Sequence, residues 1–209
     1  TVTTVDVGSP VSAPVTVAQQ RMWNVRQHTK DQSAFMIALR LDLRGPLDHA
    51  ALAWAVGMLA ERHDTFRTRF VTVDSQVRQE IAPHADLPVV WRDAEPTDDV
   101  DEQVRALCDE LVREPFDLAS APLARFGVVR VDTDRHAAVL VIDHLLCDGA
   151  SVGVVLRDLA HLYQQRVTGG QDELPAATQM RHYHEWESEY LARQTQDHLR
   201  YWRDVFSDV

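Results

Sequence analysis

The most apolar run in the chain spans residues 137–142 (AAVLVI) and predicts a buried strand in the interior of a sheet. It ends abruptly at two polar residues, Asp143 and His144, and a loop follows as far as Gly149. From Ser151 onward, apolar side chains recur at helical spacing through VGVVLRDLAHLY, which predicts an amphipathic helix. The pattern therefore places an imidazole at the end of a rigid strand, shortly before a helix begins.

The rest of the chain alternates between strand and helix periodicity. A period of two over residues 35–43 predicts a strand with one buried face, and helical spacing follows from residue 47. Two further strands flank residues 74–75 and are typical of a hairpin, and the strand that turns at 133–134 is expected to pair with the apolar run. Together these elements predict an α/β (α+β) two-layer sandwich, in which helices flank a mixed β-sheet with the apolar run near its centre.

The two ends of the chain differ from this central part. Residues 1–14 carry few large apolar side chains and indicate a linker or disordered tail. Residues 15–171 form the predicted lobe, which opens with a helix where Thr16 and Gln19 have the spacing of a capping box. Residues 172–209 follow as a helical segment. Its large aromatic side chains need another surface to cover them, and they are Trp186, Tyr190, Tyr201 and Trp202.

The composition is that of an ordinary globular protein, since 45% of the 209 residues are hydrophobic and 25% are charged. The net charge of -11, from 21 basic and 32 acidic residues, argues against nucleic acid or a membrane surface as the partner, because both attract clustered positive charge. Cys108 and Cys147 suit a reducing interior better than a disulfide framework, so the expected location is cytoplasmic. The apolar run is too short to span a membrane, and the amino terminus lacks the blocks of a signal peptide.

Candidate chemistry centres on His144, whose side chain can take or give a proton near neutral pH. Asp148 is interpreted as a buried carboxylate that requires a cationic partner, and the basic cluster around Arg62 and Arg67 is the densest source of one. Gly149, at the helix start, is a candidate backbone N–H donor for an oxyanion. Taken alone, a histidine and an aspartate four residues apart are more often a structural pair than a catalytic site.

Other kinds of site find less support in the sequence. His182 and His184, two apart on a predicted helix, point to different faces, so no metal site is expected there. Phosphate-binding glycine loops and the GxSxG elbow are absent, which removes the usual acyl-enzyme routes.

Five motifs, in this order along the chain, resemble the amino-terminal half of a nonribosomal peptide synthetase condensation domain. They are AQQRMW (18–23), RHDTFRTRF (62–70), PFDLASAPLARF (115–126), DHLLCDG (143–149) and HLRYWRD (198–204). The resemblance implies a fold like that of chloramphenicol acetyltransferase, with two similar lobes and a tunnel between them. This chain resembles only the first lobe and the helices that lead into the second.

The signature of the family is HHxxxDG. His144 falls on the second, catalytic histidine, Asp148 on an aspartate that is structural in the family and held by an arginine, and Gly149 on the glycine. Asp143 occupies the place of the first histidine, so an Asp143→His change is expected to keep or raise condensation activity. The related heterocyclization domains carry DxxxxDxxS, which Asp143, Asp148 and Ser151 also fit, although AQQRMW and RHDTFRTRF favour ordinary condensation.

The resemblance implies acyl transfer that forms an amide bond between a donor acyl thioester and an acceptor aminoacyl thioester. Both are carried on phosphopantetheine arms, so the implied partners are peptidyl or acyl carrier protein domains, adjacent synthetase domains and the missing carboxyl-terminal lobe, with no bound cofactor. His144 would either remove a proton from the attacking amine or orient it. Heterocyclization, a free-standing acyltransferase and a catalytically silent binding lobe stay open as alternatives. The isolated piece is expected to fold without turning over, and its aromatic residues can pair with a second copy as a homodimer.

Overall fold

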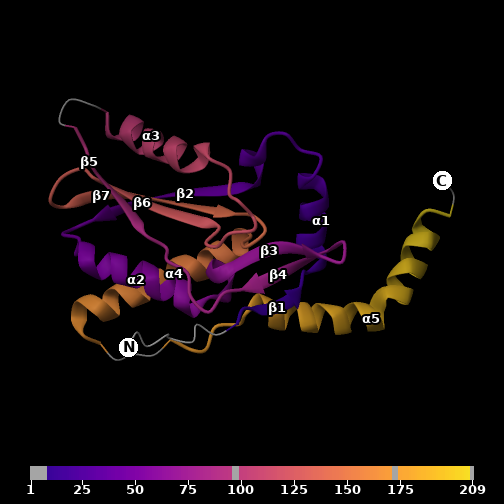
Figure 1. The fold of residues 1–209 in the computed structure, drawn as a ribbon. Helices are drawn as coiled ribbons and strands as arrows, with labels where there is room; N and C mark the ends of the chain where they lie inside the picture. Colours follow the sequence, from indigo (N-terminus) through magenta and orange to yellow (C-terminus); the bar gives the residue numbers. More distant parts are fainter. Residues whose placement is uncertain (1–8, 96–98, 171–173, 208–209) are drawn as a thin grey trace, which may run out of the picture.

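The structure is a computed structural model that describes residues 9–95, 99–170 and 174–207 (Figure 1). Its larger sheet has the strand order β2-β7-β6-β5. The strands are β2 (Met36–Arg44), β7 (Arg135–Asp143), β6 (Ala124–Arg130) and β5 (Val89–Asp93). Because β7 is antiparallel to both neighbours whereas β5 and β6 are parallel, the sheet is mixed. The predicted mixed sheet, with the apolar run on an interior strand, is confirmed.

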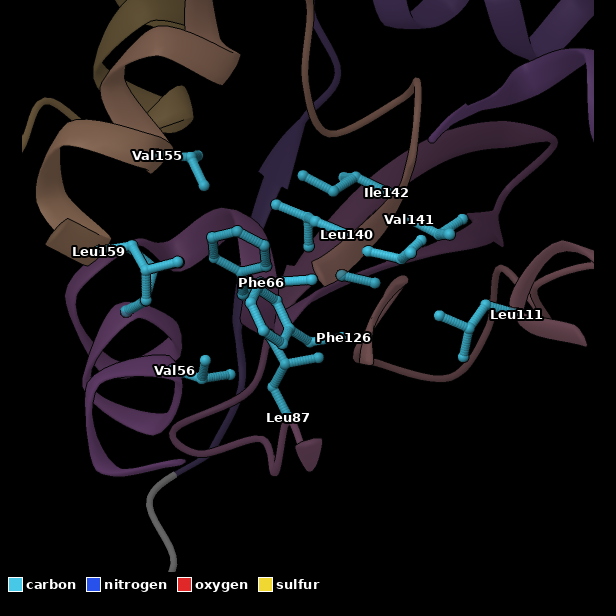
Figure 2. Close-up of a cluster of buried hydrophobic side chains, with 14 of the residues drawn as sticks. Val56, Phe66, Leu87, Leu111, Phe126, Leu140, Val141, Ile142, Val155 and Leu159 are labelled. Carbon is cyan, nitrogen blue, oxygen red and sulfur yellow. The ribbon is translucent and has the colours of Figure 1, made fainter. Parts of the chain in front are cut away.

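Helices cover both faces of this sheet. In Figure 1, α3 (Val100–Arg113) lies on one side, and α2 (His49–Arg62) and α4 (Gly149–Thr168) lie together on the other. Figure 2 shows Phe126 and Leu140 among side chains of the α2 and α4 side, whereas Val141 lies on the side of Leu111, which belongs to α3. Successive residues of β7 therefore point into two apolar layers, which explains why residues 137–142 are continuously apolar rather than alternating.

A second, smaller sheet has the order β1-β4-β3 and contains the predicted hairpin. Strands β3 (Thr68–Val73) and β4 (Gln76–Ile81) are joined by Asp74 and Ser75, which adopt φ of 49° and 64°. Two residues in the left-handed region match the twist of the flanking strands, as short hairpin loops require. The hairpin prediction is confirmed.

The tail prediction is wrong for residues 11–14, which form β1 (Val11–Pro14) and pair with β4. The pairing uses the backbone, and Gln79 adds a hydrogen bond from Nε2 to the carbonyl oxygen of Pro14 at 2.6 Å. Only one β1 side chain, Ala13, is buried, so no apolar pattern announces the strand. Residues 1–8 of the predicted tail lie outside the described residues.

The next element, α1 (Val17–Arg26), begins as predicted. Thr16 Oγ1 accepts the Gln19 backbone N–H at 3.2 Å, and Gln19 Oε1 accepts the Thr16 backbone N–H at 2.9 Å. This reciprocal capping box confirms the helix start. Two short 3₁₀ helices, η1 (Gln32–Phe35) and η2 (Asp64–Arg67), precede β2 and β3 respectively.

The last element is a single long helix, α5 (Met180–Val205), within the predicted helical segment. Figure 1 shows α5 extending away from the sheets. None of its residues, all of which the structure describes, is buried, and its aromatic side chains are largely exposed. The predicted uncovered aromatic surface is confirmed. In the described part of the chain, every helix is too short or too polar to cross a membrane.

Candidate functional site

The loop between β7 and α4, residues 143–149, carries the candidate chemistry and is called the motif loop below. Its first turn is tight, because the Leu146 backbone N–H donates to the carbonyl oxygen of Asp143 at 3.0 Å. The backbone N–H of His144 donates to the carbonyl oxygen of Phe35 at 2.8 Å. Gln19 Nε2 in α1 donates to the carbonyl oxygen of Leu145 at 3.0 Å. Hydrogen bonds to η1 and α1 thus hold the motif loop at His144 and Leu145.

His144 lines a cleft with a volume of about 670 Å³. The walls come from α1, η2, α4, the motif loop and the segment at residues 175–180. The His144 ring is half-buried, and its Nδ1 is enclosed without a hydrogen-bond partner among the described residues. No acidic side chain in the described ranges therefore orients the imidazole in the way that a triad orients its base.

Asp148 differs from the prediction of a buried carboxylate held by an arginine. It is exposed and serves as the N-cap of α4, where its Oδ1 accepts the Ser151 backbone N–H at 2.8 Å and the Ser151 hydroxyl at 2.6 Å. These hydrogen bonds lower the pKa of Asp148. The predicted pair with Arg62 or Arg67 is wrong for this structure, because local hydrogen bonds satisfy the carboxylate and both arginines have other partners.

Arg62 binds an acid that the sequence did not single out, Asp158 in α4, with 2.8 Å between Nε and Oδ2. His63 Nε2 lies 3.0 Å from the same oxygen, and Arg157 Nη2 lies 2.9 Å from Oδ1. Burial alone would raise the pKa of Asp158, but the bonds from Arg62, Arg157 and His63 outweigh burial and hold it below its usual range. For His63, burial lowers the pKa despite Asp158. This cluster ties α2 to α4 along one wall of the cleft.

Arg67 makes a different set of contacts, mostly with backbone. Its Nη2 lies 2.8 Å from Asp64 Oδ1, and its Nη1 donates to the carbonyl oxygen of Ala82 at 2.7 Å. It does not line the cleft. Among the predicted site residues, the structure therefore brings His144, Asp148, Ser151 and Arg62 to the cleft and leaves Arg67 to hold η2 against β4.

Gly149 is the first residue of α4, beside Asp148. A Cβ added to it would meet nothing within 4 Å, so the space in front of its backbone is open. Its φ is not in the left-handed region, and the glycine is therefore not needed here for a turn. Gly149 is not among the residues that line the cleft, so the oxyanion contact of its backbone N–H stays a prediction.

Asp143, the residue that departs from the family signature, is fully buried and paired. Its Oδ2 lies 2.5 Å from Arg26 Nη1, and the two side chains are 0% and 4% exposed. Sequence reasoning missed Arg26. The reason is that the burial of Gln19 and Arg26, which lie seven residues apart on one face of α1, is seen only in the structure. A polar pair on a buried helix face requires buried partners.

This chain belongs to the condensation domain family, whose model, described as "Condensation domain", matches residues 11–209. Tyrocidine synthase 3 of Brevibacillus parabrevis is 34% identical over 204 residues, which are 95% of this chain and 3% of that protein. The first condensation domain of the calcium-dependent antibiotic synthetase superposes with a TM-score of 0.86 at 21% identity, over 97% of this chain and 50% of that chain. The fold expectation is thereby confirmed.

A further solved structure, the complex of the X-domain and OxyB from teicoplanin biosynthesis, matches with a TM-score of 0.79 at 27% identity. The match covers 97% of this chain and 45% of that chain. The chain therefore spans about half the length of the solved domains that it matches and a small part of the synthases.

Proposed function

We propose that this chain is the amino-terminal lobe of a nonribosomal peptide synthetase condensation domain and supplies the catalytic histidine for amide bond formation. The observation that carries the proposal is the position of His144, which is fixed by backbone hydrogen bonds at the end of a buried strand and lines the cleft. The proposed substrates are a donor acyl thioester and an acceptor aminoacyl thioester, both on phosphopantetheine arms of carrier proteins.

In the proposed reaction, the acceptor amine nitrogen attacks the donor thioester carbon. The carbon–sulfur bond then breaks, the nitrogen loses one proton, and the departing pantetheine thiolate takes up a proton and leaves as the thiol. Both reactants are already reactive, so alignment can supply much of the rate, up to ~7–11 kcal/mol in well-oriented intramolecular reactions. Because Nδ1 of His144 has no acidic partner among the described residues, we assign this histidine to orienting the amine through its other ring nitrogen.

The cleft and α5 are both exposed, which supports the proposal that this lobe needs other protein domains to cover them before it can act. The proposed partners are carrier protein domains, adjacent synthetase domains and the second lobe of the condensation domain, in the cytoplasm. The isolated 209-residue chain is expected to bind neither thioester in an aligned geometry and to be inactive. Its exposed aromatic residues on α5, among them Trp186 and Trp202, can pair with a second copy when the natural partner surface is absent.

The test is single-turnover transfer between loaded carriers, with the two-lobe protein that contains this chain. His144→Ala should lower amide formation by about 10²-fold, the size of effect expected when a reacting group loses its alignment. His84→Ala is the matched control, because His84 is exposed and does not line the cleft. Equal activity of the His144 variant and the wild type would overturn the proposal.

The mass of the product separates the other reactions. A ring with loss of water would indicate heterocyclization, which Asp143, Asp148 and Ser151 fit by spacing. An ester or amide released from the carrier would indicate a free-standing acyltransferase. A silent lobe that only binds a partner is the second candidate, because one of the matching solved structures is a complex of an X-domain with another protein, OxyB. It predicts no product while carriers or another protein still bind.

A further inference from the structure

Arg26, the last residue of α1, contacts the groups that hold His144 on two sides. Its Nη1 donates to Asp143 Oδ2 at 2.5 Å, and its guanidinium carbon lies 5.3 Å from the centre of the Phe35 ring. Asp143 directly precedes His144, and the carbonyl oxygen of Phe35 accepts the His144 backbone N–H at 2.8 Å. A single buried guanidinium therefore connects the two segments that fix the backbone of the candidate histidine.

The other oxygen of Asp143 extends this connection beyond His144. Asp143 Oδ1 accepts the backbone N–H of Leu145 at 3.0 Å, while Oδ2 is taken by Arg26. Each oxygen of the Asp143 carboxylate therefore has a partner: Oδ1 binds the motif loop, and Oδ2 binds α1. A rotation of the Asp143 side chain that weakens its contact with Arg26 therefore also disturbs the hydrogen bond to the backbone N–H of Leu145, the residue after His144.

Arg26 itself is held in a second direction. Its Nε donates to Gln32 Oε1 at 2.6 Å, and Gln32 Nε2 donates to the carbonyl oxygen of Thr29 at 2.6 Å. The guanidinium is planar, so bonds in two directions fix its orientation in a way that a lysine ammonium cannot reproduce. Enclosure of both Arg26 and Asp143 strengthens these charge-assisted bonds, because little water competes with them.

We propose that Arg26, acting through Asp143, is the positioning residue for His144, an inference that rests on the proposed function of His144. Arg26 does not line the cleft, so it touches no substrate. Its role is to set the position from which the imidazole enters the cleft. Asp143 is then a working alternative to the first histidine of the family signature, and not a sign of lost activity.

Kinetics of two variants in the two-lobe protein test this assignment. Arg26→Met removes the guanidinium, and Asp143→Asn keeps an acceptor for the Leu145 N–H but removes the charge. Each should lower kcat for amide formation by about 10²-fold, the size of effect expected from a small misplacement of a catalytic group. KM for both loaded carriers should stay within about twofold, because substrate contacts are unchanged.

Two further variants show whether Arg26 and Asp143 act as one unit. The double variant Arg26→Met/Asp143→Asn should be no slower than the slower single variant, because either change alone already breaks the connection. Arg26→Lys, which keeps a cation within reach of Asp143, should recover part of the lost kcat. Losses that multiply in the double variant would contradict the proposal.

A variant that is destabilised far from the site serves as the control. It separates the positioning of His144 from a general loss of stability. Leu107→Ala empties a buried site in α3, on the sheet face opposite α2 and α4, and should lower the melting temperature. At a temperature where every variant is folded, its kcat should equal that of the wild type. A loss of kcat in Leu107→Ala as large as in Arg26→Met would reduce Arg26 to a purely structural role.

A spectroscopic measurement on the 209-residue chain keeps the proposal independent of the assay. The NMR resonance of His144 Cε1–H should shift or broaden in Arg26→Lys and Asp143→Asn, the two milder changes, and stay unchanged in Leu107→Ala. If the two-lobe wild type makes no amide, the proposed function fails while this spectrum still decides on Arg26. An unaltered His144 resonance in both milder variants would overturn the positioning role.

Discussion

The two ends of the motif loop each carry an aspartate, and the two aspartates serve opposite purposes. Asp143, at the end of β7, is fully buried and is paired with Arg26 from α1. Asp148, at the start of α4, is exposed and accepts hydrogen bonds from Ser151 three residues later. One carboxylate joins distant parts of the chain, whereas the other completes the helix in which it lies.

The buried ion pair of the motif loop therefore lies at its first residue, Asp143, and not at Asp148, where it was expected. The family signature led us to expect a buried pair at Asp148, but the buried pair beside His144 is made by Asp143. Breaking a buried pair costs ~3–5 kcal/mol, whereas loss of an exposed helix cap costs ~1 kcal/mol. The two ends of the loop can therefore be told apart by the size of their effects on stability.

The largest effect is expected at the buried end. Asp143→His leaves the Arg26 guanidinium buried without its partner, so the free energy of unfolding of the chain should fall by ~3–5 kcal/mol in a denaturant titration. The structure thus revises the expectation that restoring the HHxxxDG signature keeps or raises activity. The double variant Arg26→Met/Asp143→Leu removes both charges and should recover most of the lost stability. A double variant as unstable as the single one would contradict this account.

A smaller effect is expected at the exposed end. Asp148→Ala removes the N-cap of α4 and should lower the free energy of unfolding by ~1 kcal/mol. Asp148→Ser is the matched control, since serine also caps helices well and should retain most of the stability. A loss of ~3 kcal/mol or more in the alanine variant would instead indicate that Asp148 has a buried cationic partner.

The contribution of the Asp148 cap to stability should depend on pH. Hydrogen bonds from Ser151 lower the pKa of Asp148, so its charge stabilises the fold fully above its unfolded pKa of ~3.9. The contribution is lost as the pH falls through the lower, folded pKa. The advantage of the wild type over Asp148→Asn in free energy of unfolding should therefore decrease below about pH 4. An advantage that grows on acidification would mean that the pKa of Asp148 is raised.

The smallest effect is expected for Ser151→Ala. The hydroxyl donates to Asp148 Oδ1 at 2.6 Å in an exposed position, and the Ser151 backbone N–H continues to hold the same oxygen after the substitution. Thermal unfolding should show a change of no more than ~0.5 kcal/mol. A larger loss would place the Ser151 side chain, and not its backbone, at the centre of the cap.

Prediction from the sequence worked where the decisive contacts are local. The capping box of Thr16 and Gln19 and the hairpin at residues 74–75 involve neighbours along the chain, so residue type and spacing were sufficient. It failed for β1, whose partner strand lies about 65 residues away and is bound through backbone groups common to every sequence. Backbone pairing of this kind leaves no side-chain pattern to detect.

The candidate site likewise has features that depend on local sequence and features that depend on distant contacts. The sequence indicated His144 at a strand end and Gly149 at a helix start, because hydrophobic periodicity locates both boundaries. It could not select the partner of any charged side chain. Arg26 and Asp143 lie 117 residues apart, and Arg62 and Asp158 lie 96 apart. Many arginines were available to each aspartate, and composition offers no means of ranking them.

The sequence by itself determined most of the elements, their order and the segment that carries the histidine, since these follow from periodic burial and local capping; β1 is the exception. Only the tertiary structure decided which aspartate is buried and which arginine neutralises it. The physical reason is that a charge can be enclosed only where a partner reaches it with suitable geometry. In this chain, the packing of α1 against the end of β7 brings Arg26 to Asp143, and Asp148 is left to cap α4.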